Sequence, residues 1–209
     1  MILDIDGTLW DTRPLLAEAW NEAIRRDGRS EARVDPEILK GLLGRTMADI
    51  ARRMLPDVPP EARKEIMDAC TAMEHRRLEA DLCRVLYPGV AETLRAMAPE
   101  RRLFIVSNCE NGYVDLFLRK TGLGDVISDA EWYGRTLAHK GISIQRLMER
   151  QRIHRAVYVG DTQGDLEAAG FAGIPFVFAA YGFGSPARWD HKLGGFWELG
   201  DLMPRLDRK

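Results

Sequence analysis

The sequence contains few cysteines, and they form no pattern. Its 209 residues include only three, Cys70, Cys83 and Cys109, and no two of them are spaced as in a CxxC motif. An odd number of widely separated cysteines argues against a disulfide-stapled scaffold and against a cysteine-rich zinc site. Reduced thiols in a cytoplasmic protein are the simplest interpretation.

Long apolar runs and a strong net charge are missing as well. No run approaches the roughly 20 apolar residues of a membrane-spanning helix. The opening residues Met-Ile-Leu-Asp-Ile-Asp lack the basic start of a signal peptide. The formal net charge of -2 gives no general attraction to nucleic acid or to an anionic membrane. We therefore expect a soluble cytoplasmic protein with neither of these partners.

Short apolar stretches without clean alternation predict a buried parallel sheet. Its strands are expected at residues 1–5, 103–107, 126–128, 156–160 and 175–179. Helical patterns alternate with the later strands, at residues 89–97, 113–121, 141–150 and 165–172. This alternation predicts an α/β fold with a doubly wound parallel sheet, that is, a Rossmann-like core.

Residues 13–85 follow a different pattern. They contain helical patterns at residues 15–27, 36–43, 46–54 and 60–82 and no convincing strand. A chain of 209 residues with 45% hydrophobic residues can hold one domain plus an insertion, or two small domains. We therefore predict a helical cap of residues 13–85, inserted into a core built from residues 1–12 and 86–209.

Two carboxylates end the first predicted strand. Asp4 and Asp6 are followed directly by Gly7 and Thr8. Alternate side chains of an extended segment share a face, so both carboxylates point the same way. Like charges held this close repel unless a cation or a shared proton stabilises them, and Gly7 lets the chain turn sharply. The pattern favours a metal-assisted catalytic site over an ordinary acidic turn.

Polar residues also follow two later strands. Ser107 and Asn108 end one of them, and Asp161 ends another, with Asp165 four residues further on. The carboxyl ends of parallel strands form the crevice in which open α/β sheets bind their ligands. Lys140 opens a helix before the strand that leads to Asp161. The sequence therefore predicts that acids, a lysine and small hydrogen-bonding groups gather at one edge of the sheet.

The order of these motifs resembles the haloacid dehalogenase superfamily of phosphohydrolases, in its branch with a helical cap after the first motif. Asp-Ile-Asp-Gly-Thr-Leu-Trp-Asp-Thr, at residues 4–12, resembles the first motif of that family. Val-Ser-Asn at residues 106–108 resembles the second, Lys140 the third, and residues 159–165 the fourth. The stretch 158–184, which ends in Ala-Ala-Tyr-Gly-Phe-Gly, is similar to phosphoglycolate-phosphatase-like members.

The resemblance implies a phosphatase that works through an aspartyl-phosphate. Asp4 would be the nucleophile, and Asp6 would protonate the leaving alkoxide and later activate water. A Mg²⁺ cofactor would be held by Asp4, the main-chain carbonyl of Asp6 and Asp161. Asp165 would orient metal-bound waters or Lys140.

The same resemblance implies the remaining site residues and the partner. Hydrogen bonds and charge for the phosphoryl group would come from Thr8, Ser107, Asn108 and Lys140. Because the cap is small and helical, a small phosphorylated metabolite is the expected substrate, and Arg45 is a candidate contact to its distal part. The expected assembly is a monomer or a homodimer.

Some assignments keep an alternative. Asp165 equally suits a helix N-cap, because an Asp at a helix start accepts main-chain hydrogen bonds. Lys120 and Lys192 are nominal rivals of Lys140, since the residues before Lys140 depart from the family pattern. Arg45 equally suits a solvated surface position.

The function has alternatives too. A sugar phosphomutase of the same superfamily would differ by returning the phosphoryl group to its substrate, and a catalytically silent protein would only bind phosphorylated ligands. A signalling receiver domain also phosphorylates an Asp on a doubly wound sheet. The position of Asp4 on the first strand, and a chain about twice the length of a receiver domain, argue against that class.

Overall fold

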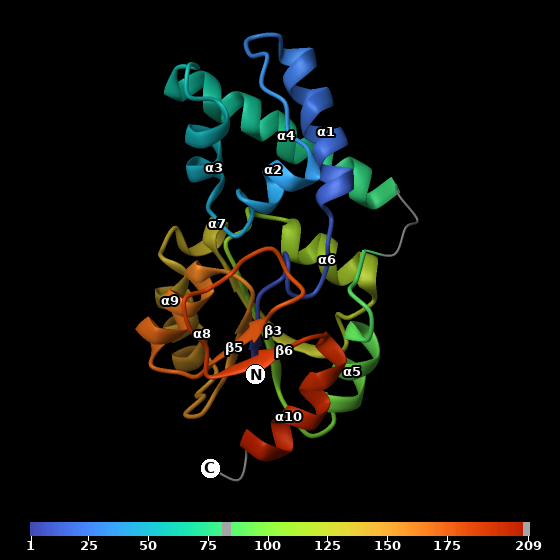
Figure 1. The fold of residues 1–209 in the computed structure, drawn as a ribbon, viewed down its shortest axis with the longest axis vertical. Helices are drawn as coiled ribbons and strands as arrows, with labels where there is room; N and C mark the ends of the chain where they lie inside the picture. The colour runs from blue at the N-terminus through green and yellow to red at the C-terminus, as the bar shows by residue number, and fades with distance from the viewer. Residues whose placement is uncertain (81–84, 207–209) are drawn as a thin grey trace. The chain divides into compact units, whose positions relative to one another are not determined.

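The computed structural model describes residues 1–80 and 85–206 (Figure 1). Cys83 and the last two residues of the helix predicted at 60–82 lie outside the described residues. The chain divides into two compact units. The core unit is Met1–Asp11 with Val85–Lys209, and the inserted unit is Thr12–Arg84. The role of residues 13–85 as a cap stays a prediction.

The described part of the core unit contains a six-stranded parallel sheet with the order β3-β2-β1-β4-β5-β6. The strands are β1 (Ile2–Leu3), β2 (Leu103–Ser107), β3 (Ile127–Trp132), β4 (Tyr158–Gly160), β5 (Phe176–Ala179) and β6 (His191–Leu193). β2 and β3 lie on one side of β1, and after β3 the chain crosses over to β4, which lies on the other side of β1 and is followed outward by β5 and β6. This confirms the predicted doubly wound parallel α/β class.

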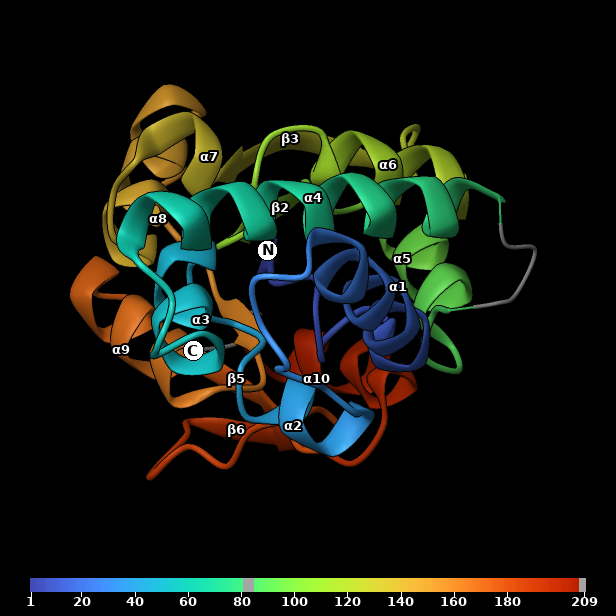
Figure 2. The same ribbon diagram turned by 90° about the horizontal axis from the view of Figure 1, so that it is seen from above.

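Helices cover both faces of the sheet (Figure 2). The helical elements of the core unit are α5 (Val90–Met97), α6 (Tyr113–Thr121), α7 (Tyr133–Thr136), α8 (Lys140–Arg150), α9 (Gln163–Ala172), the 3₁₀ turn η1 (Phe196–Glu198) and α10 (Leu199–Leu206). α8 and α9 pack against each other on one face, and α5, α6 and α10 lie on the other. Right-handed crossovers dictate this distribution, because the chain runs outward from β1 in opposite directions on the two sides.

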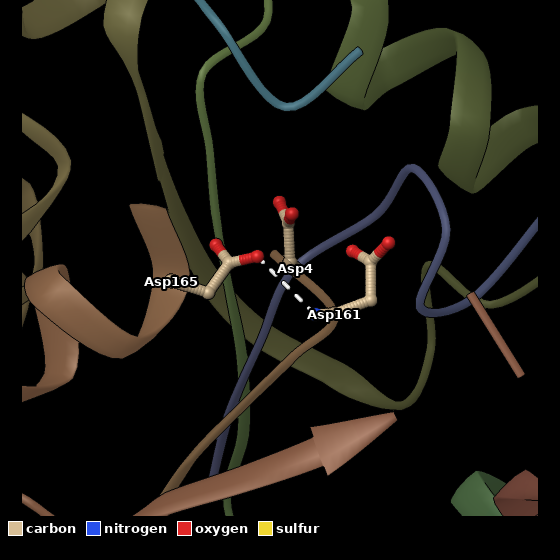
Figure 3. A group of neighbouring side chains, drawn as sticks. All are labelled: Asp4, Asp161 and Asp165. Carbon is tan, nitrogen blue, oxygen red and sulfur yellow. Dashed lines mark hydrogen bonds between the residues drawn. The ribbon is translucent and has the colours of Figure 1, made fainter. Parts of the chain in front are cut away.

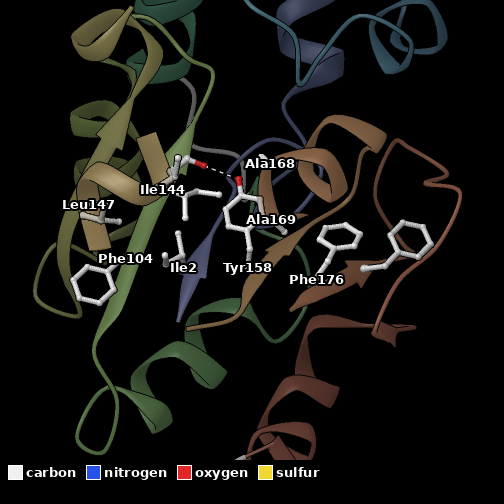
Figure 4. Packing of buried hydrophobic residues seen from close by; sticks show 10 residues of the cluster. Ile2, Phe104, Ile144, Leu147, Tyr158, Ala168, Ala169 and Phe176 are labelled. Carbon is white, nitrogen blue, oxygen red and sulfur yellow. Dashed lines mark hydrogen bonds between the residues drawn. The ribbon is translucent and has the colours of Figure 1, made fainter. Parts of the chain in front are cut away.

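Alternate strand residues fill the core beneath α8 and α9 (Figure 4). Ile2, Phe104, Tyr158 and Phe176 come from four strands, and each is at most 1% exposed. They pack against apolar side chains of the two helices, namely Ile144, Leu147, Ala168 and Ala169. Tyr158 also donates a hydrogen bond of 2.8 Å from its hydroxyl to the main-chain oxygen of Val106, so that its polar tip is satisfied inside the core.

The central strand β1 is short, but both of its neighbours hold it. Ile2 pairs with Phe104 of β2 and with Tyr158 of β4. The strand ladder extends beyond Leu3, because the main-chain N–H of Asp4 donates to the oxygen of Val159 at 2.9 Å. This hydrogen bond fixes the backbone of Asp4 at the carboxyl end of the sheet.

Several elements differ from the sequence expectations. β3 is longer than the predicted 126–128, and β6, α7 and α10 were not predicted. β6 is only three residues long, and His191 and Lys192 give it no apolar pattern. α10 contains Pro204, a residue that normally argues against a helix interior.

The inserted unit contains four helices in its described residues: α1 (Arg13–Asp27), α2 (Pro36–Lys40), α3 (Met47–Met54) and α4 (Pro60–Ala80). α1 and α4 pack together, and the indole of Trp20 donates a buried hydrogen bond of 2.8 Å to Glu74. Across both units, none of the helices in the described residues is long and apolar enough to cross a membrane.

Candidate active site

Three carboxylates meet at the carboxyl edge of the sheet (Figure 3). Asp4 follows β1, Asp161 follows β4, and Asp165 lies in the first turn of α9. Leu3 pairs with Val159 in adjacent parallel strands, which brings Asp4 and Asp161 out at the same edge. One oxygen from each of the three carboxylates lies within 4.8 Å of the others, and each residue is at most 1% exposed.

A buried lysine joins this cluster. Lys140 is the first residue of α8, and its Nζ lies 2.7 Å from Oδ1 of Asp165 and 3.1 Å from Oδ2 of Asp4. Burial alone would lower the pKa of Lys140, but the two carboxylates outweigh it and raise the pKa above its ordinary value. Of the two rival lysines, Lys192 belongs to β6 and lies over the ring of Trp189, and Lys120 lies in the last turn of α6. The structure therefore places Lys140, and neither rival, beside Asp4.

Asp165 performs two structural tasks at once. With Thr162 it forms a capping box at the start of α9, and its Oδ2 accepts hydrogen bonds from the main-chain N–H and the hydroxyl of Thr162. The main-chain N–H of Asp161 donates to the same oxygen at 3.2 Å. Burial would raise the pKa of Asp165, but the Lys140 ammonium outweighs it and lowers the pKa. The helix-cap alternative is thus present, and it leaves Oδ1 to hold Lys140.

A glycine-rich loop after β5 holds Asp161. The main-chain N–H groups of Phe183 and Gly184 donate to its Oδ2 at 2.7 and 3.3 Å. The hydroxyl of Thr8 lies 3.4 Å from its Oδ1, so this predicted phosphate-binding residue is fully buried against Asp161. This role of the loop was not predicted from the sequence. Gly182 and Gly184 were the available signal, because glycines permit close approach of a backbone.

The acid cluster fits a divalent cation. Burial raises the pKa of Asp4 to about 7 and that of Asp161 well above its usual range. In the described residues, Oδ1 of Asp4 has no hydrogen-bond partner. Buried, unpaired carboxylate oxygens are costly, and a hard cation bound to them removes that cost. Oδ1 of Asp165 is already paired with Lys140, whereas Asp161 forms no ion pair within the described part of the chain and Asp4 keeps Oδ1 free. Asp4 and Asp161 are therefore the better-placed anionic donors.

Asp6 lies in a different environment from Asp4. Its Oδ1 accepts a hydrogen bond of 2.9 Å from the indole N–H of Trp10 and one of 2.7 Å from the hydroxyl of Tyr113. Burial raises the pKa of Asp6, and the two hydrogen bonds oppose that effect. Trp10 is fully buried and packs within the turn after β1. Tyr113 lies far along the chain in the first turn of α6, and no sequence motif marks it as a site residue.

The remaining predicted residues are Ser107 and Asn108 in the core unit and Arg45 in the inserted unit. Ser107 ends β2, next to β1, and is 4% exposed, and Asn108 follows it as a partly buried residue. Arg45 belongs to the inserted unit, is exposed, and lies directly before Thr46, which caps α3. Its Nε lies 3.5 Å from the main-chain oxygen of Gly41. The described contacts of Arg45 are therefore local ones.

The comparisons with known proteins identify the family. The model of the haloacid dehalogenase-like hydrolase family matches residues 1–179. A phosphoglycolate phosphatase of Nitrosospira multiformis is 30% identical over 192 residues, which cover 88% of this chain and 83% of that protein. One from Vibrio vulnificus is 30% identical over 195 residues, 86% of this chain and 82% of that protein. The chain therefore belongs to the haloacid dehalogenase-like hydrolase family.

A solved structure gives an independent comparison of the fold. CbbY from Rhodobacter sphaeroides, in complex with xylulose-(1,5)-bisphosphate, aligns with a TM-score of 0.82 and 23% identity over 95% of both chains. This similarity shows that the two proteins share a fold. Together with the phosphatase relatives, the family match confirms the expected enzyme class, a phosphoric monoester hydrolase.

The close packing of the glycine-rich loop after β5 predicts that Gly182 does not tolerate a larger residue. A Cβ atom at Gly182 would lie 2.2 Å from the main-chain oxygen of Gly7 and 2.5 Å from Cβ of Asp161. We expect Gly182→Ala to lower the free energy of unfolding by about 1–3 kcal/mol, the usual cost of overpacking. Phosphatase activity should fall as well, because the loop moves away from Asp161. Urea denaturation and an activity assay measure the two effects.

Gly170→Ala is the matched control. A Cβ atom at Gly170 meets nothing within 4 Å, and the residue lies inside α9. This change should be neutral, or stabilising by up to about 1 kcal/mol, because alanine favours a helix. Equal stability of the two variants would contradict the close contact at Gly182.

Proposed function

We propose that this enzyme is a Mg²⁺-dependent phosphatase that hydrolyses a small phosphorylated metabolite through an aspartyl-phosphate on Asp4. The observation that carries the proposal is the environment of Asp4. Its carboxylate is buried at the carboxyl edge of the sheet, Oδ1 lacks a hydrogen-bond partner among the described residues, and Lys140 lies 3.1 Å from Oδ2. A carboxylate with one free oxygen beside a fixed cation is suited to attack a phosphoryl group.

In the first half of the reaction, a carboxylate oxygen of Asp4 attacks phosphorus. The new bond joins that oxygen to phosphorus, and the ester bond between phosphorus and the alcohol oxygen breaks. Asp6, in its protonated form, gives its proton to the departing alkoxide. The products of this half are the free alcohol, a phosphorylated Asp4 and an ionised Asp6.

In the second half, water resolves the acyl phosphate. The carboxylate of Asp6 takes a proton from a water molecule as that water attacks phosphorus. The bond between phosphorus and the oxygen of Asp4 breaks, which releases inorganic phosphate and restores the Asp4 carboxylate. Asp6 is protonated again, so the cycle closes without another reactant.

Other residues would bind the phosphoryl group and balance its negative charge. A Mg²⁺ ion held by Asp4, Asp161 and the main-chain carbonyl of Asp6 would offset the negative charge of the phosphoryl oxygens. Lys140 balances the charge that builds up between Asp4 and the phosphoryl group. Ser107 and the backbone at Asn108 donate hydrogen bonds from the end of β2, and Thr8 orients Asp161 and the turn around it.

The relatives suggest the first substrate to test. Those from Nitrosospira multiformis and Vibrio vulnificus carry the name phosphoglycolate phosphatase. We therefore propose 2-phosphoglycolate, a small phosphorylated carboxylic acid, as the first candidate. Residues 13–85 act as the cap that selects the leaving group, and Arg45 binds the part of the substrate that is not phosphate.

Asp4→Asn should abolish hydrolysis of p-nitrophenyl phosphate. An amide is neither an adequate nucleophile nor an anionic ligand for Mg²⁺, so we expect a loss of about 10³-fold or more in kcat. Wild-type activity should also disappear with EDTA and return with Mg²⁺. Asp115→Asn, the same change at an exposed position of α6, is the control and should keep full activity. Near-normal turnover by folded Asp4→Asn would refute the mechanism.

Asp6→Asn should lower turnover in a way that depends on the leaving group. General acid catalysis typically contributes about 10²- to 10⁴-fold, and a nitrophenolate needs less of it than an alkoxide. We therefore expect a much larger loss for 2-phosphoglycolate or another alkyl phosphate than for p-nitrophenyl phosphate. Equal losses in kcat for the two substrates would exclude Asp6 as the acid.

Arg45→Ala should affect only the preferred metabolite. A lost charge-assisted hydrogen bond is worth roughly 1.5–3 kcal/mol, or about 10- to 100-fold in kcat/KM. p-Nitrophenyl phosphate should react almost unchanged, because it lacks the distal group. Arg53→Ala, at an exposed position of α3 in the same unit, is the matched control. Parallel changes on both substrates would return Arg45 to the solvated-surface interpretation.

A further inference from the structure

Two aromatic donors from distant parts of the chain converge on one oxygen of Asp6. The indole N–H of Trp10 and the hydroxyl of Tyr113 both donate to Oδ1, at 2.9 and 2.7 Å. Trp10 lies four residues after Asp6 in the turn that leaves β1, and Tyr113 opens α6. Trp10 is 0% exposed and Tyr113 is 5% exposed. We refer to these two residues as the aromatic clamp.

The rings of the aromatic clamp are fixed by packing. The ring of Trp10 meets that of Tyr113 edge to face, with centroids 5.4 Å apart and planes at 78°. It meets the ring of Phe117, one turn further along α6, at 4.9 Å and 83°. Neither donor can swing away from Asp6 without breaking these contacts, which are favourable in this geometry. The two hydrogen bonds therefore restrict rotation of the Asp6 carboxyl group.

The second oxygen of Asp6, Oδ2, differs from Oδ1 in its hydrogen bonding. In the described residues, Oδ2 accepts no hydrogen bond, and Asp6 is partly exposed while Ile5 and Gly7 on either side are buried. A protonated carboxyl group carries one hydrogen, on one of its two oxygens. Because Oδ1 already accepts two N–H or O–H donors, a proton on Oδ1 would compete with both of them. The stable place for the proton is Oδ2.

We infer that Trp10 and Tyr113 are positioning residues: their two hydrogen bonds to Oδ1 fix the orientation of the Asp6 carboxyl group and leave Oδ2 for proton exchange with the leaving group. This inference rests on the proposed acid–base role of Asp6. The proton that leaves Oδ2 goes to the alkoxide oxygen, and the later proton from water returns to Oδ2. Neither aromatic residue exchanges a proton or touches phosphorus, so neither is a catalytic residue.

A purely structural role is the alternative. Buried Trp and Tyr side chains generally find a hydrogen-bond partner, whatever that partner does. In that case loss of either donor would change stability, and any change in turnover would be equal for every substrate. A positioning role predicts unequal losses of turnover. Only substrates whose leaving group needs protonation depend on where the proton of Asp6 sits.

The test is therefore a leaving-group comparison. Tyr113→Phe removes one donor and keeps the ring, and Trp10→Phe removes the other and keeps an aromatic contact. For each, kcat and KM are measured on 2-phosphoglycolate and on p-nitrophenyl phosphate with Mg²⁺. We expect the ratio of kcat on the alkyl phosphate to kcat on the aryl phosphate to fall about tenfold in Tyr113→Phe, and further in the double variant, with KM almost constant. An unchanged ratio would overturn the inference.

Tyr181→Phe is the matched control. In the wild type, the hydroxyl of Tyr181 donates a hydrogen bond of 2.8 Å to the main-chain oxygen of Thr8, which lies in the turn between Asp6 and Trp10. This hydroxyl forms no hydrogen bond to Asp6 within the described residues. Any loss of turnover in this variant should be equal for the two substrates. A substrate ratio that falls as far in Tyr181→Phe as in Tyr113→Phe would overturn the inference. Tyr113→Phe is decisive on its own if Trp10→Phe fails to fold.

A double-mutant cycle separates this inference from the proposed function. In an Asp6→Asn background, Tyr113→Phe should cause no further change in the substrate ratio, since the proton it positions is gone. A further fall in that background would overturn the positioning role. If Asp6→Asn itself lowers turnover of both substrates equally, the acid–base proposal fails, whatever the aromatic variants show.

Discussion

A buried lysine shared by two carboxylates is the interaction on which the rest of the site depends. Lys140 comes from the start of α8, Asp165 from the first turn of α9, and Asp4 from the end of β1. An ammonium group this deeply buried is stable only while both anions remain beside it. The three elements must therefore pack in one arrangement for the charges to be balanced, so that the core geometry and the chemistry of the site are set together.

The same arrangement gives neighbouring acids different tasks. Asp165 is surrounded by donors and is held in its ionised form. Asp4 has one free oxygen, which suits a nucleophile and cation ligand, and Asp6 has one oxygen bound by aromatic donors. In each case the number and direction of the donors, rather than the residue type, decides what the carboxyl group can do.

The architecture was predictable from sequence because it depends on local pattern. Apolar stretches marked four later strands, and the position of Asp4 and Asp161 at strand ends followed from the parallel order of the sheet. The hydrogen bonds to Asp161 were not predictable, because Phe183 and Gly184 use main-chain N–H groups that any residue possesses. Tyr113 was missed for a related reason. Its hydroxyl reaches Asp6 only through the packing of α6 beside the first turn, which no local spacing reveals.

The placement of β1 has a consequence for how the protein acquires its site. Among the described residues β1 is the first strand, yet it occupies the middle of the sheet, where Ile2 pairs with residues 104 and 158. Pairings between segments so far apart require large loops to close, which makes them slow steps in folding. During synthesis, the segment that carries Asp4 has no strand partner until β2 has emerged, and Asp161 joins it only after β4. The inserted unit, whose residues lie between β1 and β2, has by then been made in full. The acid cluster is therefore among the last parts of the molecule to form, and a nascent chain has no assembled cluster until most of its length exists.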